Sequence, residues 1–167
     1  MKTSYLPAIV FGVIYGCFLA SLVLSAGELP ERVATHFNWL GRADGWMTRT
    51  TYLVSMAVCG VVQSTFIVGL FFSMRFAPNG AFSLSGRDYW IAPERRAATF
   101  SYLLRQSFWL ASVMTGFLAG IHGLTIQANR QAGAFARWST PMAIALGGCV
   151  LMGIAVWSVD LIRHFKK

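Results

Sequence analysis

The stretch TSYLPAIVFGVIYGCFLASLVLSAG, residues 3–27, contains 25 consecutive residues without Asp, Glu, Lys or Arg. A helix needs about 20 predominantly apolar residues to cross a hydrocarbon core of about 30 Å. The run therefore predicts a membrane-spanning helix near 4–26. The alternative is a helix buried inside a soluble protein, but such a helix is rarely this long and this free of charge.

Three further runs of the same kind follow. Residues 50–74, 106–129 and 138–159 also lack Asp, Glu, Lys and Arg. They predict helices near 51–73, 106–127 and 140–161. Strands of a membrane β-barrel are short and alternate polar with apolar residues, which these runs do not do. The sequence thus predicts an all-α integral membrane protein with four transmembrane helices, forming one membrane domain over 1–167.

The overall composition agrees with this class. Of the 167 residues, 56% are hydrophobic and 12% are charged, whereas a typical soluble domain is about 25% charged. This excludes a disordered chain and an ordinary soluble enzyme, and makes the lipid bilayer the first expected partner. The net charge of +8 does not indicate nucleic acid, because the sequence shows neither a clustered basic face nor a known nucleic-acid-binding module.

The Lys and Arg residues predict the orientation of the helices, because cytoplasmic loops carry the excess of these residues. Nine lie on the side of the two termini: Lys2, Arg75, Arg87, Arg95, Arg96, Arg105, Arg163, Lys166 and Lys167. Five lie on the other side: Arg32, Arg42, Arg49, Arg130 and Arg137. We therefore expect both termini and the 74–105 segment to be cytoplasmic, and the 27–50 loop to be external.

Small residues at a spacing of four predict how the helices associate, since membrane helices pack by close backbone approach. The longest stripe is in the third helix: Ala111, Thr115, Ala119 and Gly123, with Ser112, Gly116 and Gly120 alongside. Shorter stripes lie in the first helix (Gly12, Gly16, Ala20) and the last (Ala145, Cys149, Gly153). We expect the third helix to be central. Such faces also suit a homo-oligomer, and the sequence does not separate the two arrangements.

The cytoplasmic segment 74–105 contains a loop and then a helix. Pro78, Asn79, Gly80 and Gly86 are typical of a loop. Pro93 followed by Glu94 resembles a helix start, because Pro favours the first helical position and an acid suits the first turn. No Pro or Gly follows before Gly116. An amphipathic helix is therefore expected to run directly into the third span, with Arg95 and Arg96 at the inner headgroups.

The external loop 27–50 is too rich in conformational signals to be a tether. Pro30 fixes φ, and Asp44-Gly45 is a strong turn signal. We expect a helical turn near 30–34, then a small hairpin closing around 41–45. Apolar side chains can cap the bundle end: Val33, Phe37, Leu40 and Trp46. The loop is thus predicted to form a compact, ordered extracytoplasmic cap.

His36 and Asp44 are the most reactive groups of the cap, with Asn38 nearby. A His with a carboxylate can serve as a metal-ligand pair or an acid–base pair. The alternative is a hydrogen bond that fixes the loop. One His and one Asp are too few ligands for a closed zinc site, and the familiar catalytic motifs are missing. We expect no metal and no cofactor.

His122 is the one histidine within the predicted spans, in the outer third of the third helix. An ionisable side chain inside a span is a functional hypothesis by default. The alternative is an interhelical hydrogen bond. His122 therefore joins the candidate binding residues of the external side, which are His36, Asn38, Asp44 and Trp46.

The loop sequence resembles a known family. Its pattern is Leu-Pro, His-Phe-Asn, Gly and Asp-Gly-Trp between two membrane helices, matched here by Leu29, Pro30, His36, Phe37, Asn38, Gly41, Asp44, Gly45 and Trp46. This is similar to the bacterial membrane family known as domain of unknown function 1648, shared with Sdp-type immunity and signal proteins of killing-factor systems. A second stretch resembles related members and marks a cytoplasmic motif: Tyr89, Trp90, Pro93, Glu94, Arg95 and Arg96. The resemblance implies a bacterial inner-membrane location but little biochemistry.

Two classes of function remain open on the sequence. The first is a non-enzymatic binding protein, sensor or immunity-like protein or accessory subunit, whose partner is a peptide, a lipid or another membrane protein. The second is a membrane enzyme or transporter component that uses His36, Asp44 and His122. The second requires these three side chains to converge, and the first does not.

The predicted orientation is testable by labelling single cysteines in intact cells with a membrane-impermeant thiol reagent, in a background without the native cysteines. We expect Arg42→Cys to be labelled and Arg87→Cys to be protected, because the positive-inside rule places them on opposite sides. The reverse pattern would show that the orientation is inverted.

Overall fold

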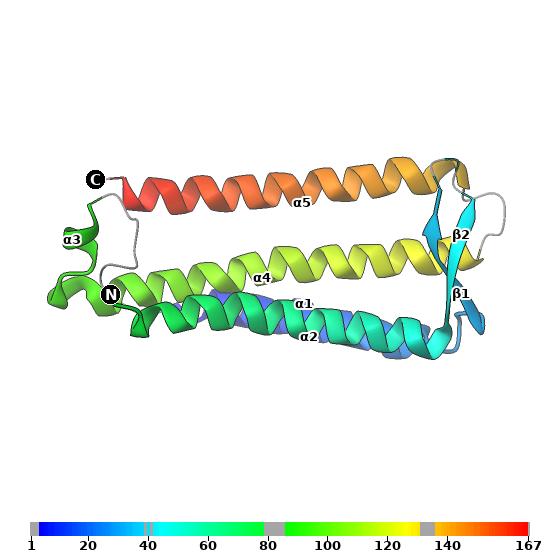
Figure 1. Ribbon diagram of the computed structural model, residues 1–167, viewed down its shortest axis with the longest axis horizontal. Coiled ribbons are helices and arrows are strands. Elements are labelled where there is room, and N and C mark those ends of the chain that lie inside the picture. The colour runs from blue at the N-terminus through cyan, green and yellow to red at the C-terminus, as the bar shows by residue number, and fades with distance from the viewer. Residues whose placement is uncertain (1–3, 39, 41, 79–85, 131–135, 167) are drawn as a thin grey trace.

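The computed structural model describes residues 4–38, 40, 42–78, 86–130 and 136–166, with side chains described for all of these except 136–140. The elements in chain order are α1 (Leu6–Ser25), β1 (Arg32–Phe37), β2 (Ala43–Thr48), α2 (Arg49–Ser73), the 3-10 turn η1 (Met74–Phe76), α3 (Arg87–Trp90), α4 (Pro93–Arg130) and α5 (Ala136–Phe165). The long helices run side by side (Figure 1).

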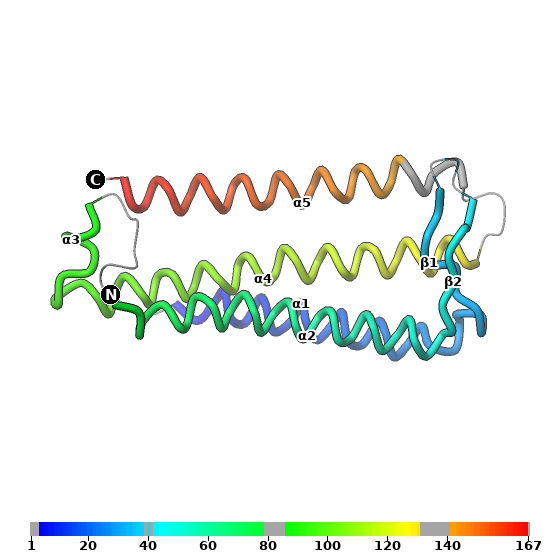
Figure 2. The backbone as a smooth tube through the Cα atoms, in the orientation of Figure 1, coloured from blue at the N-terminus to red at the C-terminus, as the bar shows by residue number. Residues whose placement is uncertain are grey.

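Four helices are long and apolar enough to cross a membrane, which confirms the predicted fold class. The two labelled ends of the chain lie at one end of the bundle, beside α3, and the β1–β2 hairpin lies at the other (Figures 1 and 2). Much of the outer helix surface is exposed and apolar, as at Leu24, Phe66 and Leu151. Such a surface is suited to lipid tails and not to water.

The α4 helix is one continuous helix of 38 residues, as the lack of Pro and Gly between Glu94 and Gly116 predicted. Its first turns are amphipathic: Phe100 and Leu103 are buried against α3 and the end of α5, while Glu94 and Arg95 are exposed. Of the loop predicted before it, residues 79–85 lie outside the described residues, as does Gly41 of the family pattern.

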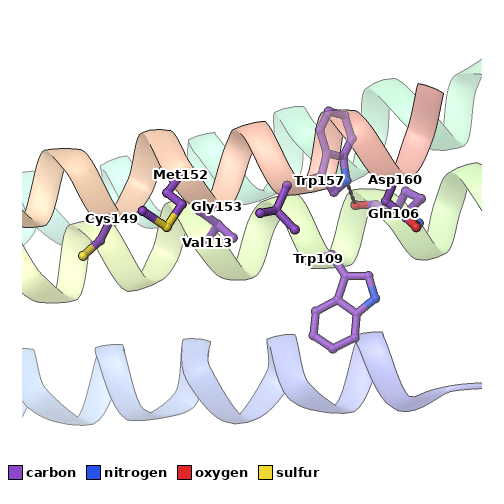
Figure 3. A pocket seen from close by; sticks show the side chains of 9 residues that line it. Gln106, Trp109, Val113, Cys149, Met152, Gly153, Trp157 and Asp160 are labelled. Atoms are coloured by element: carbon purple, nitrogen blue, oxygen red, sulfur yellow. Dashed lines mark hydrogen bonds between the residues drawn. The ribbon is translucent and has the colours of Figure 1, made fainter. Parts of the chain in front are cut away.

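The α4 helix packs against α1, α2 and α5, so the predicted central position of the third span is confirmed. Ala111 and Thr115 of its small-residue stripe are fully buried. On the α5 side, Val113 lies against Gly153, where an added Cβ would come 3.2 Å from Val113 Cγ1 (Figure 3).

The small-residue stripe of α1 does not pack as predicted. Gly12 and Gly16 face outward, and an added Cβ at either would meet nothing within 4 Å. The cause is that α1 turns larger residues, Phe18 and Leu22, towards α2 and α4, and these lie about a third of a turn around the helix from the two glycines.

The cap is a two-stranded antiparallel hairpin in which Val33 is paired with Met47 and Ala34 with Trp46. The hairpin was predicted, but the helical turn near 30–34 was wrong, because Arg32–Ala34 belongs to β1. Asp44-Gly45 was also wrongly assigned to the turn, since both residues lie within β2.

The reversal of the hairpin lies between β1 and β2, where the Asn38 N–H donates to the Arg42 carbonyl at 2.9 Å. The Asn38 side chain supports the turn by accepting from the N–H groups of Leu40 and Arg42, both at 3.0 Å. Gly45 serves a different purpose from the predicted one. It allows close approach to His36, whose Cβ would lie 2.9 Å from an added Cβ.

The contact between α1 and α2 gives a matched pair of glycine variants on α2. At Gly60 an added Cβ would come 2.7 Å from Cε1 of Phe18, a ring that is 1% exposed, whereas at Gly69 it would meet nothing within 4 Å. Gly60→Ala should lower the free energy of unfolding in detergent by about 1–3 kcal/mol through overpacking. Gly69→Ala should be neutral or stabilising, because Ala favours helix over Gly. Equal thermal stability of the two variants would contradict this packing.

Candidate functional site

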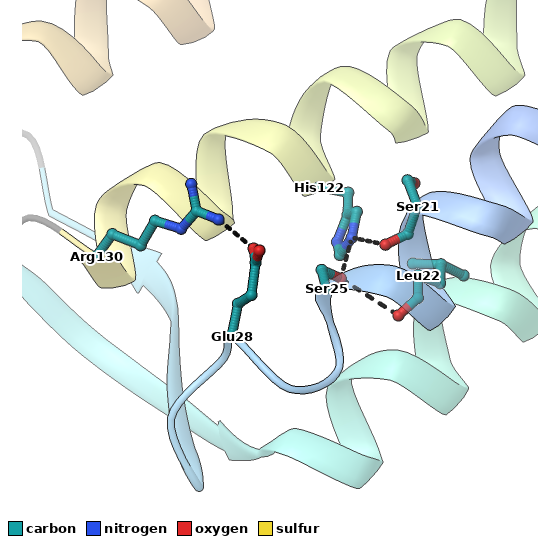
Figure 4. Close-up of polar contacts among 6 residues, drawn as sticks. All are labelled: Ser21, Leu22, Ser25, Glu28, His122 and Arg130. Carbon is teal, nitrogen blue, oxygen red and sulfur yellow. Dashed lines mark hydrogen bonds and ion pairs between the residues drawn. The ribbon is translucent and has the colours of Figure 1, made fainter.

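A buried hydrogen-bond cluster joins three helices just below the cap. His122 of α4 is 1% exposed. Its Nε2 lies 2.9 Å from Ser25 Oγ of α1, and its Nδ1 lies 2.9 Å from the hydroxyl of Tyr52 of α2. The Tyr52 ring also stacks on the imidazole, with centroids 5.7 Å apart. Figure 4 shows His122 pointing from α4 at Ser25 and the end of α1.

The acceptors around His122 determine its tautomer. Nε2 also lies 3.4 Å from the Ser21 carbonyl oxygen, and a carbonyl only accepts, so the proton sits on Nε2. Ser25 Oγ accepts from Nε2 and donates to the Leu22 carbonyl at 3.2 Å. Nδ1 then holds a lone pair, to which the Tyr52 hydroxyl donates. Both ring nitrogens of the neutral imidazole thereby form hydrogen bonds with neighbouring helices. This agrees with the interhelical hydrogen bond that the sequence indicated as the alternative role of His122.

His36 and Asp44 lie elsewhere, on the outside of the cap. The Nδ1 of His36 and Oδ1 of Asp44 form a hydrogen bond, as the loop-fixing alternative predicted. Their side chains are 74% and 45% exposed, and exposed pairs of this kind contribute about 0–1 kcal/mol. The pair therefore supports the hairpin only weakly.

The three side chains of the enzyme hypothesis are not brought together. His122 bonds to α1 and α2, and His36 bonds to β2. Within the described residues, no group of three or more His, Cys, Asp or Glu side chains is placed to hold a metal ion.

The cap is held on the bundle mainly by Asn129, near the end of α4. The Ala34 N–H donates to Asn129 Oδ1 at 2.8 Å, and Asn129 Nδ2 donates to the Ala34 carbonyl at 2.9 Å. One amide side chain thus pairs with a strand as a neighbouring strand would. A second Nδ2 bond, to the Thr125 carbonyl at 2.8 Å, fixes the amide to α4.

Charged and apolar contacts complete the attachment. Glu28 forms an ion pair with Arg130 beside the cluster (Figure 4). Arg49 at the start of α2 donates to the Leu29 carbonyl at 3.1 Å. Val33 is fully buried against the ends of α1 and α2. Sequence reasoning missed Asn129, Glu28 and Arg130; the one signal was that the third span ends in Asn-Arg on the same predicted side as the loop.

Large apolar side chains on both faces of the hairpin are partly exposed. Trp46 is 50% exposed, Met47 43% and Leu40 52%. The Arg32 guanidinium lies over the Trp46 ring at 6.0 Å from its centroid. A partly open aromatic ring beside a cation is a common anchor in binding surfaces.

The backbone of β2 offers a further feature. Both backbone groups of Ala34 are bonded to Asn129, so they point away from β2. In an antiparallel ladder the residue opposite such a residue also directs its backbone groups outward. Trp46 is opposite Ala34, and its N–H and C=O therefore face the outer edge of β2. Among the described residues, no backbone hydrogen bond covers this edge.

The second sequence motif, around Trp90 and Pro93, makes structural contacts at the other end of the bundle. Trp90 is buried against Phe165 of α5, and Pro93 and Glu94 begin α4. Arg95 lies over the Tyr89 ring at 3.8 Å. Arg96 donates to the carbonyls of residues 75 and 77, at 3.1 and 3.2 Å. The motif thus connects α3, α4 and the end of α2.

Fold and cap together define the class: a small membrane-protein fold of four spanning helices with a hairpin fixed across one end. Residues 12–60 match the family described as Domain of unknown function (DUF1648). This segment covers most of α1, the hairpin and the first half of α2, and the match supports the resemblance that the loop sequence indicated. No curated protein and no solved structure shows significant similarity to the chain.

The Asn129 attachment is testable by substitution. Asn129→Leu removes both partners of Ala34, and leaving buried polar groups unpaired costs about 1–3 kcal/mol. We expect a lower unfolding temperature in detergent and faster proteolysis within 32–48. Gln127→Leu, at an exposed position two residues earlier, is the control and should change stability by no more than about 0.5 kcal/mol. Equal protease resistance of the two variants would show that Asn129 does not hold the hairpin.

Proposed function

We propose that this chain is a non-enzymatic binding protein of the bacterial inner membrane, forming a single membrane domain, whose hairpin cap captures an extended peptide segment. The segment belongs to a free peptide or to an exposed part of another membrane protein. In this role the chain serves as a sensor, an immunity-like protein or an accessory subunit.

One observation carries the proposal: the hairpin is fixed along one edge, and no backbone hydrogen bond from the described residues covers the other. Asn129 occupies the outer edge of β1, whereas the outer edge of β2 faces outward at Trp46. Extended peptides bind by adding a strand to such an edge, with backbone hydrogen bonds giving affinity and side-chain contacts giving specificity. The rigid attachment favours binding, since little conformational freedom is lost when the peptide docks.

The side chains next to this edge suit the same role. Trp46 is exposed on β2 and Met47 follows it. Trp is among the residues that most often dominate binding energy at interfaces, and Met adapts to varied apolar partners. The exposed His36–Asp44 pair and Asn38 at the turn add polar contacts on the same hairpin.

The sidedness of the cap follows from charge. The hairpin and the two chain ends lie at opposite ends of the bundle (Figure 1), and nine of the fourteen Lys and Arg residues belong to the side of the termini. The positive-inside rule then places the termini in the cytoplasm and the cap outside. A peptide arriving from outside the cell would meet the cap first, which fits the resemblance to immunity and signal proteins of killing-factor systems.

The alternative of a membrane enzyme or transporter component requires His36, Asp44 and His122 to act on one substrate. The partners of His122 are all helix groups, and its ring is buried. The binding role needs no such convergence and is favoured for that reason.

The proposal is tested by co-purification from native membranes in mild detergent, with quantitative mass spectrometry of the bound polypeptides. A partner recovered with the wild-type chain should fall at least tenfold with Trp46→Ala, because loss of a binding hot spot costs about 2 kcal/mol or more. The control is Phe76→Ala, which removes an even more exposed aromatic ring at the opposite end of the bundle. Unchanged recovery with Trp46→Ala, or equal loss with both variants, would refute binding through the cap.

A further inference from the structure

A groove between α4 and α5 lies on the membrane-facing side of the bundle, away from the cap. Its volume is about 560 Å³, within the range of small-molecule sites, about 300–1,000 Å³. Its walls include Val113 of α4 and Cys149, Met152 and Val156 of α5. Figure 3 shows the lining residues extending along the two helices from Cys149 at one end to Asp160 and Gln106 at the other.

The length of the groove matches one leaflet of a bilayer. Cys149 and Asp160 are eleven residues apart on α5, or about 16 Å at a rise of about 1.5 Å per residue. Half of the hydrocarbon core is about 15 Å thick. The apolar part of the groove can therefore hold one acyl chain of a lipid in the leaflet on the side of the termini, with Asp160 at the headgroup level.

The polar end of the groove is a carboxylate without a cation. Tyr102 donates to Asp160 Oδ2 at 3.1 Å and Gln106 Nε2 donates to the same oxygen at 2.8 Å. In the described part of the chain, no Lys, Arg or His forms an ion pair with Asp160. The only acid of α5 is thus oriented by two neutral donors and forms no ion pair with a described cation.

A second charge lies one turn further along α5. Arg163 is exposed and likewise has no ion-pair partner among the described residues. Positions three apart on a helix are neighbours on its surface. The headgroup level therefore offers an anionic and a cationic group side by side, which complements a zwitterion carrying a primary ammonium and a phosphate. A primary ammonium has three N–H donors for a carboxylate, and a guanidinium binds phosphate well.

We propose that the α4–α5 groove binds a phosphatidylethanolamine molecule, with its ammonium on Asp160, its phosphate towards Arg163 and one acyl chain along Val113, Met152 and Val156. Phosphatidylcholine fits less well because its trimethylated amine has no N–H donor. Phosphatidylglycerol fits less well because it has no amine and carries net negative charge towards Asp160. This site is separate from the cap and does not depend on the function proposed for it.

The test uses the full-length chain, purified in detergent and freed of native lipid. Phosphatidylethanolamine, phosphatidylcholine and phosphatidylglycerol with identical acyl chains are added back at equal concentration, and bound lipid is counted by native mass spectrometry. The wild-type chain should retain phosphatidylethanolamine at least fivefold more than either of the other lipids. Equal retention of all three, or a preference for phosphatidylglycerol, would overturn the proposal.

Two variants separate the headgroup from the groove. Asp160→Asn keeps a side-chain oxygen for Tyr102 and Gln106 but removes the charge, so it should bind phosphatidylethanolamine and phosphatidylcholine equally. If the variant keeps the fivefold preference for phosphatidylethanolamine, the carboxylate does not recognise the headgroup. If the variant loses both lipids, the carboxylate does not select between headgroups.

Val156→Trp fills the groove and should abolish retention of every lipid. Its control is Leu151→Trp, an exposed α5 position outside the groove, which should behave as wild type; equal behaviour of the two would place the lipid elsewhere.

Discussion

The hydrogen bonds of His122 fix the relative positions of three helices in a medium that offers no water as a substitute partner. In lipid, an unpaired polar group is costly, so Ser25 of α1 and Tyr52 of α2 must stay level with His122 of α4. Asn129 lies seven residues further along α4, about two turns, and therefore on the same face as His122. Once the three helices are in register, that amide reaches Ala34 and the hairpin can dock.

The α5 helix stands apart from this arrangement. The contacts that hold the cap come from the end of α1, the start of α2 and the end of α4, and α5 packs chiefly against α4. Its interface with α4 uses small residues at a few points, such as Gly153 against Val113 and Gly120 against Leu146. From Cys149 past Gly153 to Asp160 the two helices leave room for a ligand. A second groove, of about 460 Å³, is lined by α1, α2 and Phe108 of α4.

The sequence predicted the helices well because their length and lack of charge follow directly from the thickness of the bilayer. The uninterrupted α4 was predictable for an equally simple reason, the absence of helix-breaking residues before Gly116. Which face of a helix points inward was harder to predict, as Gly12 and Gly16 show. Lipid tails and a protein interior are equally apolar, so hydrophobic periodicity carries little information about orientation in a membrane.

The cap was predicted only in outline, because its partners are remote in sequence. Asp44-Gly45 has the local chemistry of a turn, but the pairing of Ala34 with Asn129, 95 residues away, selects a strand and shifts the reversal towards Asn38. The role of Tyr52 was similarly hidden, since His122 lies 70 residues away. The polar residues that matter most here are those whose partners only the fold brings near.

The cap and the groove share one element, α4, which carries Asn129 at one end and Gln106 near the other. Coupling between two sites requires an element with two alternative arrangements that both sites bias. The α4 helix is continuous between these residues and contains no Pro or π-bulge there. His122, seven residues before Asn129, fixes it against α1 and α2. We therefore expect lipid in the groove and peptide on the cap to bind without affecting one another. In the described part of the chain the hairpin is attached to α1, α2 and α4 alone, so the proposed peptide site and the proposed lipid site are supported by different helix contacts.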